Sequence, residues 1–350
     1  MKKYVLLVCS LILFGCSKES PADSSNELPA NTKGVFILNE GGFGKVNASL
    51  SLYIPDSHKV YQNIFETANN RSLGDVANDM ILFDNKGYIV VQNSDKVEVV
   101  SLETKKSLGV MSLPGKTPNK ILIISTSKGY ITNLYKQSVT AFNPSTLAVL
   151  KDSIAVGNNP QSMAYVNGKV YVCNSGYGSD NTVSVINPTN DSVVKAIVTA
   201  AGPSEIGVDK NGKVIILCTG YSDWSNSAND TPGNISIVDP AVDSVVQTIP
   251  FSLSQYGHPM KMSLSTSGDG FTFTNKGITK FNTTSGTITA ESYIPKNGYT
   301  LKVDNDNGEL YVGDAMDFVQ NGLMYRYSKQ GNLQDSMTVG IIPGTIVIAK

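Results

Sequence analysis

The stretch NPQSMAYVNGKVYVCNSGYGSDNTVSVINPTNDSVVKAIV, residues 159–198, contains four short apolar segments separated by turn residues. Apolar and polar side chains mostly alternate within these segments, which is typical of half-buried β-strands. Asn167-Gly168 and Asn187-Pro188 mark tight turns, because glycine accepts a positive φ and proline presets its own. The stretch therefore predicts one four-stranded antiparallel sheet, with strands over 160–166, 169–174, 182–187 and 191–198.

The glycine turn of this stretch recurs along the chain, each time followed by an apolar strand. Between Gly34 and Gly308 the seven marker glycines are about 46 residues apart on average. A period of about 40–50 residues with several short strands in each unit is typical of a β-propeller. The marker glycines are Gly34, Gly87, Gly129, Gly168, Gly212, Gly270 and Gly308.

The two ends of the repeat complement each other. Gly34 begins a unit at its second strand, and residues 343–348 match a first strand without a unit of its own. We expect the last strand to join blade 1 and close the ring, which protects two sheet edges. The prediction is an all-β, seven-bladed β-propeller of four-stranded blades over residues 34–350. One miscounted unit would change the count to six or eight blades.

The first 33 residues precede this repeat. A basic start and an apolar run over residues 4–14, too short to span a membrane as a helix, predict a signal peptide over 1–15. Leu13-Phe14-Gly15-Cys16 resembles a bacterial lipobox. We therefore expect Cys16 to be lipidated and residues 16–33 to form a polar, flexible tether. The alternative is a signal peptide with an incidental cysteine.

The composition argues against several classes of partner. The formal net charge is −1, so nucleic acid is not an expected partner, and the membrane is expected to be contacted only through the lipid anchor. Cys173 and Cys218 stand one repeat apart, where equivalent strands of neighbouring blades are too far apart for a disulfide. We expect two buried free thiols and no metal, because no histidine is near either cysteine in sequence.

The extra length of the chain falls on one rim of the expected ring. In an antiparallel blade, the loop between the second and third strands lies on the same rim as the connection to the next blade. We call this the loop rim and the opposite one the turn rim. Insertions on one face usually mark the binding face of a repeat protein. The loop-rim insertions are 40–48, 66–74, 174–181, 219–233, 251–257 and 314–322.

These insertions carry aromatic residues among Ser, Gly, Asn and Asp. That composition is typical of binding surfaces in which rigid anchors stand among adaptable hydrogen-bonding groups. The alternative is that the aromatic side chains only pack within their own loops. The aromatic residues are Phe43, Tyr177, Tyr221, Trp224 and Phe318.

Motifs for catalysis are absent from the sequence. No phosphate-binding loop, HExxH or GxSxG occurs, and the chain has only two histidines. His58 is expected in a solvated turn and His258 at the loop rim, in a structural or ligand-contact role. A general base at His258 is the alternative, although nothing near it in sequence orients it. We therefore predict that the protein is not an enzyme and holds no cofactor.

Two acidic segments contain residue types that bind calcium in other proteins. The run from Asp304 to Glu309 has the composition of a calcium loop but coincides with a hairpin turn and lacks the later bidentate glutamate. We interpret it as a turn. Asp223, Asn229 and Asp230 of the 219–233 loop leave a calcium site open as an alternative.

Residues 159–197 resemble YncE-type propeller repeats, and similar units cover residues 34–350. Together with the lipobox and polar tether, they make the chain resemble surface lipoproteins of Bacteroidetes, nearest to the BtuG-type cobalamin-binding lipoproteins. The resemblance implies an outer-membrane, lipid-anchored protein that faces the cell exterior. It also implies cobalamin or a related corrinoid as transported ligand, and a BtuB-like TonB-dependent transporter as partner. No short motif transfers ligand residues.

The loop rim is compatible with such a ligand. Cobalamin is large and has many amide arms and a phosphate, which suits a wide mouth rich in Asn, Ser, Gln and Tyr. The alternative function is a protein- or glycan-binding adhesion or scaffold module that uses the same rim. The predicted ligand-binding residues are Phe43, Asn119, Tyr135, Gln161, Tyr177, Tyr221, Trp224, His258, Tyr299 and Phe318.

Overall fold

A computed structural model describes residue 28 and residues 33–350 of the protein. The predicted signal peptide, the lipidation of Cys16 and nearly all of the predicted tether lie outside the described residues. In the part that is described, no helix combines the length and the apolar character needed to cross a membrane.

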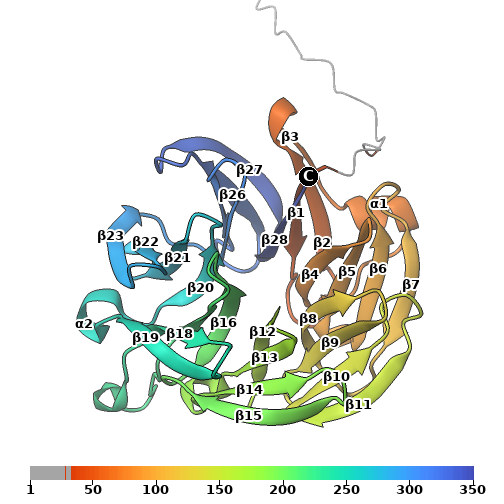
Figure 1. Ribbon diagram of the computed structural model, residues 1–350. Coiled ribbons are helices and arrows are strands. Elements are labelled where there is room, and N and C mark those ends of the chain that lie inside the picture. The colour runs from red at the N-terminus through yellow and green to blue at the C-terminus, as the bar shows by residue number, and fades with distance from the viewer. Residues whose placement is uncertain (1–27, 29–32) are drawn as a thin grey trace, which may run out of the picture.

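Seven four-stranded antiparallel sheets form a ring of blades (Figure 1). Within each blade the strands follow one another from the axis outward. Blade 1 contains β28 (Pro343–Ala349), β1 (Gly34–Asn39), β2 (Ser49–Ile54) and β3 (Lys59–Tyr61). Blade 2 contains β4 (Ala77–Phe83), β5 (Lys86–Val91), β6 (Lys96–Ser101) and β7 (Ser107–Ser112). Blade 3 contains β8 (Pro118–Ser125), β9 (Lys128–Asn133), β10 (Ser138–Phe142) and β11 (Val149–Ala155).

The remaining four blades repeat this arrangement. Blade 4 contains β12 (Pro160–Val166), β13 (Lys169–Asn174), β14 (Thr182–Asn187) and β15 (Ser192–Val198). Blade 5 contains β16 (Pro203–Val208), β17 (Val214–Cys218), β18 (Asn234–Asp239) and β19 (Ser244–Pro250). Blade 6 contains β20 (Met260–Leu264), β21 (Asp269–Thr274), β22 (Gly277–Asn282) and β23 (Thr287–Ile294). Blade 7 contains β24 (Thr300–Val303), β25 (Leu310–Asp314), β26 (Asn321–Tyr327) and β27 (Leu333–Ile341).

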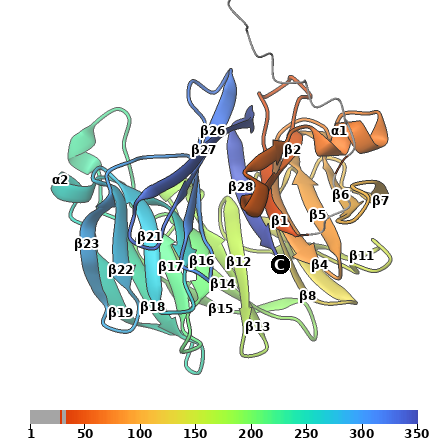
Figure 2. The ribbon, with the colours of Figure 1, turned by 90° about the horizontal axis from the view of Figure 1, so that it is seen from above.

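The C-terminal strand closes the ring. β28 pairs antiparallel with β1, with Gly34 opposite Ala349 and Ile37 opposite Ile346. Figure 2 shows the two strands side by side, although more than 300 residues separate them in the chain. The predicted fold, the count of seven blades and the closure by the last strand are confirmed. Both Gly34 and Ala349 lie at the turn rim.

The core consists of apolar layers between neighbouring blades. Tyr88 and Val90 of blade 2, for example, pack with Ile121 and Phe142 of blade 3. The second strand of each blade is buried along nearly all its length, whereas the inner strands β8 and β12 are mostly half-buried. The inner strands contact one another around the ring. They therefore border a solvent-accessible bore, whose loop-rim end we call the mouth.

Polar contacts at the turn rim connect neighbouring blades. Asp191, between β14 and β15, accepts a hydrogen bond from Tyr130 Oη at 2.7 Å and lies 2.5 Å from Lys128 Nζ. Burial and the Asp191 carboxylate raise the pKa of Tyr130, which keeps its hydroxyl a donor. Asp243 of blade 5 accepts hydrogen bonds from Lys169 and Tyr171 of blade 4 in the same way. Since the lysine belongs to the recurring glycine turn, that turn also carries inter-blade contacts.

Two short helices lie in connections between blades. α1 (Ile64–Asn69) joins blade 1 to blade 2, and α2 (Leu253–Tyr256) joins blade 5 to blade 6. The thiols of Cys173 and Cys218 are free and buried, as predicted. Burial raises the pKa of Cys218 to about 11 and that of Cys173 well above its ordinary value, so both thiols stay protonated at neutral pH.

Candidate ligand-binding site

The long loops of different blades form a joined surface on the loop rim. The 219–233 loop of blade 5 lies against the 175–181 loop of blade 4. A Cβ on Gly178 would lie only 2.9 Å from the Cα of Tyr221, so the two loops touch through their backbones. The insertions that the sequence placed on this rim therefore support one another instead of standing apart in solvent.

Exposed aromatic side chains concentrate on this rim. Trp224 is fully exposed, at 101%, and Phe43 is 80% exposed. Tyr165, near the turn-rim end of β12, is the one exposed aromatic side chain away from the loop rim among the described residues. Exposed apolar groups gathered on one face mark interaction surfaces. The other three exposed aromatics of the loop rim are Tyr135, Tyr177 and Phe318.

Two of these aromatics are joined across a blade boundary. Tyr177 Oη of blade 4 donates to Tyr135 Oη of blade 3 at 3.1 Å. The backbone of Tyr177 has a left-handed φ of 51° inside the 3-10 turn Gly176–Gly178. Burial, together with the Tyr135 hydroxyl, raises the pKa of Tyr177, so its phenol stays neutral. The pair therefore presents two aromatic faces in a fixed position.

Hydrogen bonds inside the 219–233 loop hold Trp224 outward. Asp223 accepts from Asn229 Nδ2 at 2.8 Å and from the Ser225 backbone N–H at 2.9 Å. These bonds lower the pKa of Asp223 to about 2, so it stays ionised and keeps its acceptors. Trp224 follows directly in the chain, and its side chain is fully exposed. The loop is organised before any partner binds.

His258 and Gly220 fix the base of the same loop. His258 Nδ1 lies 3.0 Å from the Thr219 carbonyl oxygen, and its Nε2 lies 3.5 Å from Asp230 Oδ2. Gly220 has a φ of 82°, and a Cβ there would lie 2.2 Å from the Thr231 carbonyl oxygen. Only glycine fits such a position. His258 thus contacts the base of the loop through Nδ1, while Nε2 is buried without a hydrogen-bond partner in the described part of the chain. Its contact with a ligand stays a prediction.

Tyr299 connects the rim to the bore. Its hydroxyl donates to Glu40 Oε2 at 3.0 Å, and its ring meets Phe318 edge-on with centroids 5.7 Å apart. Lys261 Nζ lies 5.7 Å from the centre of the Tyr299 ring. A hollow of about 400 Å³, which Met316 also lines, opens beside these two rings. It is large enough for part of a ligand but not for a whole cofactor-sized one.

Amide side chains from three neighbouring inner strands form a chain at the mouth. Asn78 Nδ2 on β4 donates to Asn119 Oδ1 on β8 at 3.0 Å. Asn119 Nδ2 in turn donates to Gln161 Oε1 on β12 at 2.9 Å. Amides both donate and accept, so this chain can bind a ligand that carries amide groups of its own.

Charged side chains of five different blades meet in the bore. Lys120 Nζ on β8 lies 3.8 Å from Asp79 Oδ1 on β4, and Lys261 Nζ on β20 lies 3.8 Å from Glu205 Oε1 on β16. Lys302 on β24 completes the group. Sequence reasoning missed these residues. The signal was present, since three of them follow two positions after a proline that begins or precedes an inner strand.

The charged groups of the bore shift one another's pKa across the axis. Burial disfavours the charged form of Lys120, but attraction from Asp79, Glu205 and Glu40 outweighs it and raises the pKa of Lys120. Burial raises the pKa of Glu40 despite the opposing attraction of Lys261 and Lys120. Because the interacting groups stand on separate blades, only a shared central space brings them together.

The structure thus arranges the predicted ligand residues in pairs and chains. It joins Tyr135 with Tyr177, Tyr299 with Phe318, and Asn119 with Gln161. Tyr221 lies at the contact between two loops, and Phe43 and Trp224 project freely from theirs. All of them lie on the loop rim or at the mouth; which of them touch a ligand stays a prediction.

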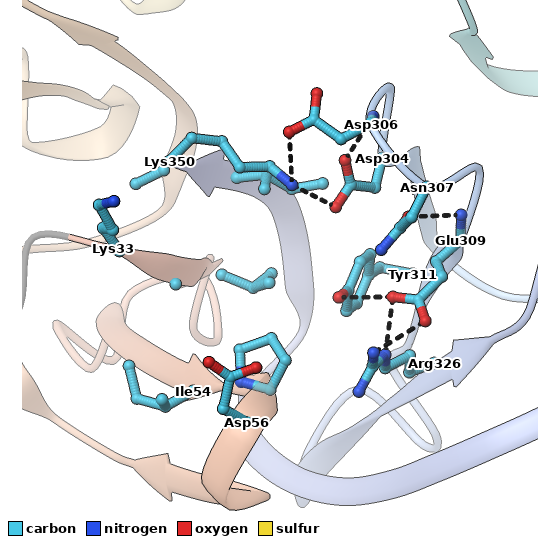
Figure 3. A pocket seen from close by; sticks show the side chains of 15 residues that line it. Lys33, Ile54, Asp56, Asp304, Asp306, Asn307, Glu309, Tyr311, Arg326 and Lys350 are labelled. Atoms are coloured by element: carbon cyan, nitrogen blue, oxygen red, sulfur yellow. Dashed lines mark hydrogen bonds and ion pairs between the residues drawn. The ribbon is translucent and has the colours of Figure 1, made fainter.

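A second hollow, of about 490 Å³, lies at the turn rim between blades 1 and 7 (Figure 3). Lys350 Nζ lies 2.7 Å from Asp304 Oδ2 and 3.2 Å from Asp306 Oδ2. Glu309 and Arg326 form a bidentate pair with both distances at 2.8 Å. Because these charges neutralise one another, the hollow presents fewer unpaired charged groups to a ligand than the mouth does.

The acidic segments do not assemble into a metal site among the described residues. No group of three or more His, Cys, Asp or Glu side chains converges there. The run from Asp304 forms the β24–β25 turn, in which the Gly308 backbone N–H donates to the Asp304 carbonyl at 2.8 Å. The carboxylate of Asp223 is occupied by bonds within its own loop.

The fold and the mouth define a seven-bladed β-propeller with a polar bore and an aromatic loop rim. The chain belongs to the family of the domain of unknown function DUF5074, whose model matches residues 33–298. No curated protein matches the chain. Membership therefore identifies the family and leaves the ligand open.

Solved structures share the architecture at low sequence identity. A quinonprotein alcohol dehydrogenase-like protein from Bacteroides thetaiotaomicron is 17% identical, with a TM-score of 0.67 over 91% of this chain and 78% of that one. The Kuenenia stuttgartiensis hydrazine synthase is 14% identical, with a TM-score of 0.61 over 74% and 85%. Apo AztD from Citrobacter koseri is 10% identical, with a TM-score of 0.56 over 89% and 96%. These similarities show the propeller fold alone. One of these structures, the hydrazine synthase, is named as an enzyme.

Proposed function

We propose that this protein is a binding protein that captures cobalamin or a related corrinoid at the mouth of the propeller. The observation that carries the proposal is the combination at one rim of exposed aromatics, an amide chain and charged groups in the bore. A corrinoid has a flat macrocycle, amide arms and a phosphate, for which these groups are complementary. The resemblance to BtuG-type lipoproteins supports the same ligand.

The rim also has the rigidity that tight binding requires. The 219–233 loop is held by its own hydrogen bonds and by His258, and the Tyr135–Tyr177 pair is fixed across two blades. A pre-formed rim loses little conformational entropy when a ligand binds. Since His258 is used to orient the loop, we propose a capture role without catalysis. Turnover of a corrinoid that is lost in His258→Ala would contradict this.

We further propose that Cys16 carries a lipid and that the protein delivers its ligand to a TonB-dependent outer-membrane transporter at the cell surface. Gly34 lies at the turn rim, so an anchor in the preceding residues would approach from that side. The loop rim would then be the face left free for the ligand and the transporter. Co-purification of such a transporter with the lipidated protein, but not with Cys16→Ala, is the expected result.

The ligand is tested with the chain from residue 17 onward, which contains the whole described propeller. After soaking with cyanocobalamin and desalting, the protein should retain the visible spectrum of the corrinoid, and calorimetry should give a stoichiometry near one. Absence of both retained colour and binding heat would overturn the proposal. Unrelated coloured ligands such as haem serve as the specificity control.

A protein- or glycan-binding adhesion module is the second candidate. Full exposure of Trp224 at the end of an organised loop favours it, because such a residue suits an apolar pocket on a macromolecular partner. This function predicts no corrinoid binding but retention on an immobilised surface partner. Shortening residues 219–233 should abolish that retention.

A further inference from the structure

Three lysines reach the bore, and one of them differs from the other two. Lys120 and Lys261 each lie 3.8 Å from a carboxylate, of Asp79 and Glu205 respectively. The backbone of Lys302 pairs with Tyr311 in the β24–β25 ladder, but its side chain forms no ion pair and no hydrogen bond with any residue that the structure describes. It is therefore the lysine of the bore whose ammonium group has no carboxylate partner among the described residues.

The position of Lys302 makes its side chain available. In β24 the neighbouring residues Thr300, Leu301 and Val303 are buried, whereas Lys302 is exposed to solvent. Burial of its surroundings lowers the pKa of Lys302, against the attraction of Asp79 and Glu205. These acids belong to β4 and β16, in blades on other sides of the ring. The ammonium group therefore faces the axis and lies in a confined, partly desolvated space.

The acidic side chains around the bore all have partners of their own. The acids Asp79 and Glu205 already have lysine partners, and Glu40 hydrogen-bonds with Tyr299. Burial raises the pKa of Glu40, against the attraction of Lys261 and Lys120. Since the Lys302 ammonium group has no carboxylate at ion-pair distance, an oxyanion that enters the bore can form a charge-assisted hydrogen bond with it.

We propose that Lys302 binds the anionic group of the ligand, a phosphate ester or a carboxylate. The inference rests on the proposed capture function and narrows it: the ligand has an extended apolar or aromatic body for the rim and an anionic arm for the bore. The arm passes the amide chain of Asn78, Asn119 and Gln161 before it reaches Lys302. A neutral ligand of the same shape would lack the charged contact.

The first test compares two corrinoids that share the macrocycle. Cyanocobalamin carries a phosphodiester, and dicyanocobinamide lacks it. In Lys302→Met we expect the affinity for cyanocobalamin to fall about tenfold to a hundredfold, the range for a lost charge-assisted hydrogen bond. The affinity for dicyanocobinamide should be nearly the same as in the wild type. Lys302→Arg, which keeps the charge, should restore most of the affinity for cyanocobalamin.

The matched control is Lys329→Met, since Lys329 is an exposed lysine in the β26–β27 turn on the opposite rim. It should bind both corrinoids as the wild type does. Equal losses for the two corrinoids in Lys302→Met, or no loss for either, would overturn the role of Lys302 while leaving corrinoid capture intact.

A second measurement separates this inference from the proposed function. If the wild type binds neither corrinoid, the capture proposal fails, and Lys302 is then tested with inorganic phosphate and acetate at constant ionic strength. Phosphate should raise the melting temperature of the wild type and of Lys329→Met, but not that of Lys302→Met. A matching rise with acetate would identify a carboxylate as the group bound. Identical shifts in all three proteins would overturn the inference.

Discussion

The two rims of this propeller differ in whether their side chains pair with one another or face solvent. At the turn rim, charged and phenolic groups pair with one another between blades, as Asp191 does with Lys128 and Tyr130. At the loop rim, aromatic side chains such as Trp224 and Phe43 are exposed to solvent. The comparison teaches that one rim stabilises the ring and the other remains available for binding.

This division predicts that changes at the turn rim affect stability first. Asp191→Ala leaves Lys128 and the buried Tyr130 hydroxyl without their acceptor, so the free energy of unfolding should fall by about 3 kcal/mol. Urea unfolding followed by fluorescence measures this. Corrinoid binding to the folded variant should be unchanged.

An exposed ion pair provides the control for that change. Asp152 pairs with Lys116, but its side chain is 71% exposed, so Asp152→Ala should cost less than about 1 kcal/mol. If the Asp191 and Asp152 variants unfold at the same urea concentration, the inter-blade contacts do not carry the stability assigned to them here.

Changes at the loop rim should show the reverse effect. Trp224→Ala or Tyr177→Ala should leave the unfolding free energy within about 0.5 kcal/mol of the wild type, since neither ring is packed in the core. Affinity for the ligand should fall about tenfold or more if these rings are anchors. Tyr165→Ala, at an exposed tyrosine of the turn rim, is the matched control and should change neither quantity. Loss of binding in the control would mean that the rims are not functionally distinct.

The smallest effect concerns pH. Burial raises the pKa of Glu40 above its ordinary value, so the folded protein takes up this proton more readily than the unfolded chain. The stabilising contribution of that proton is present below the unfolded pKa and is lost as the pH rises through the folded one. As the pH rises through that window, the free energy of unfolding of the wild type should therefore fall relative to that of Glu40→Gln.

Binding should follow the same titration. When Glu40 is neutral, the mouth is more positive, so an anionic ligand should bind a few-fold more tightly as the pH is lowered through the pKa of Glu40. Glu40→Gln should weaken this dependence and keep the contact with Tyr299. Calorimetry of cyanocobalamin at a series of pH values from 4.5 upward measures it. A pH dependence of equal size in the Gln variant would exclude Glu40 as its origin.

The blades could be predicted because their signals are local. Alternating strands, the glycine turn and the prolines recur within each unit of the chain, and β-pairing within a blade joins neighbours in sequence. The rim that carries the long loops also followed, since antiparallel order determines on which side each connection lies. Even the closure by residues 343–349 was readable, because the missing strand has the pattern of its equivalents.

The centre of the site could not be derived in this way. Asp79, Lys120 and Glu205 are separated by many residues, and each alone resembles an ordinary surface charge. Likewise the Tyr135–Tyr177 contact depends on how two blades are oriented. The sequence by itself determined the sheets, their number and the face with long loops, because these depend on local periodicity and turn chemistry. Only the tertiary structure decided which side chains meet on the axis, and that the Lys302 side chain has no ion-pair partner among the described residues, because closing the ring brings distant strands within range of electrostatic interaction.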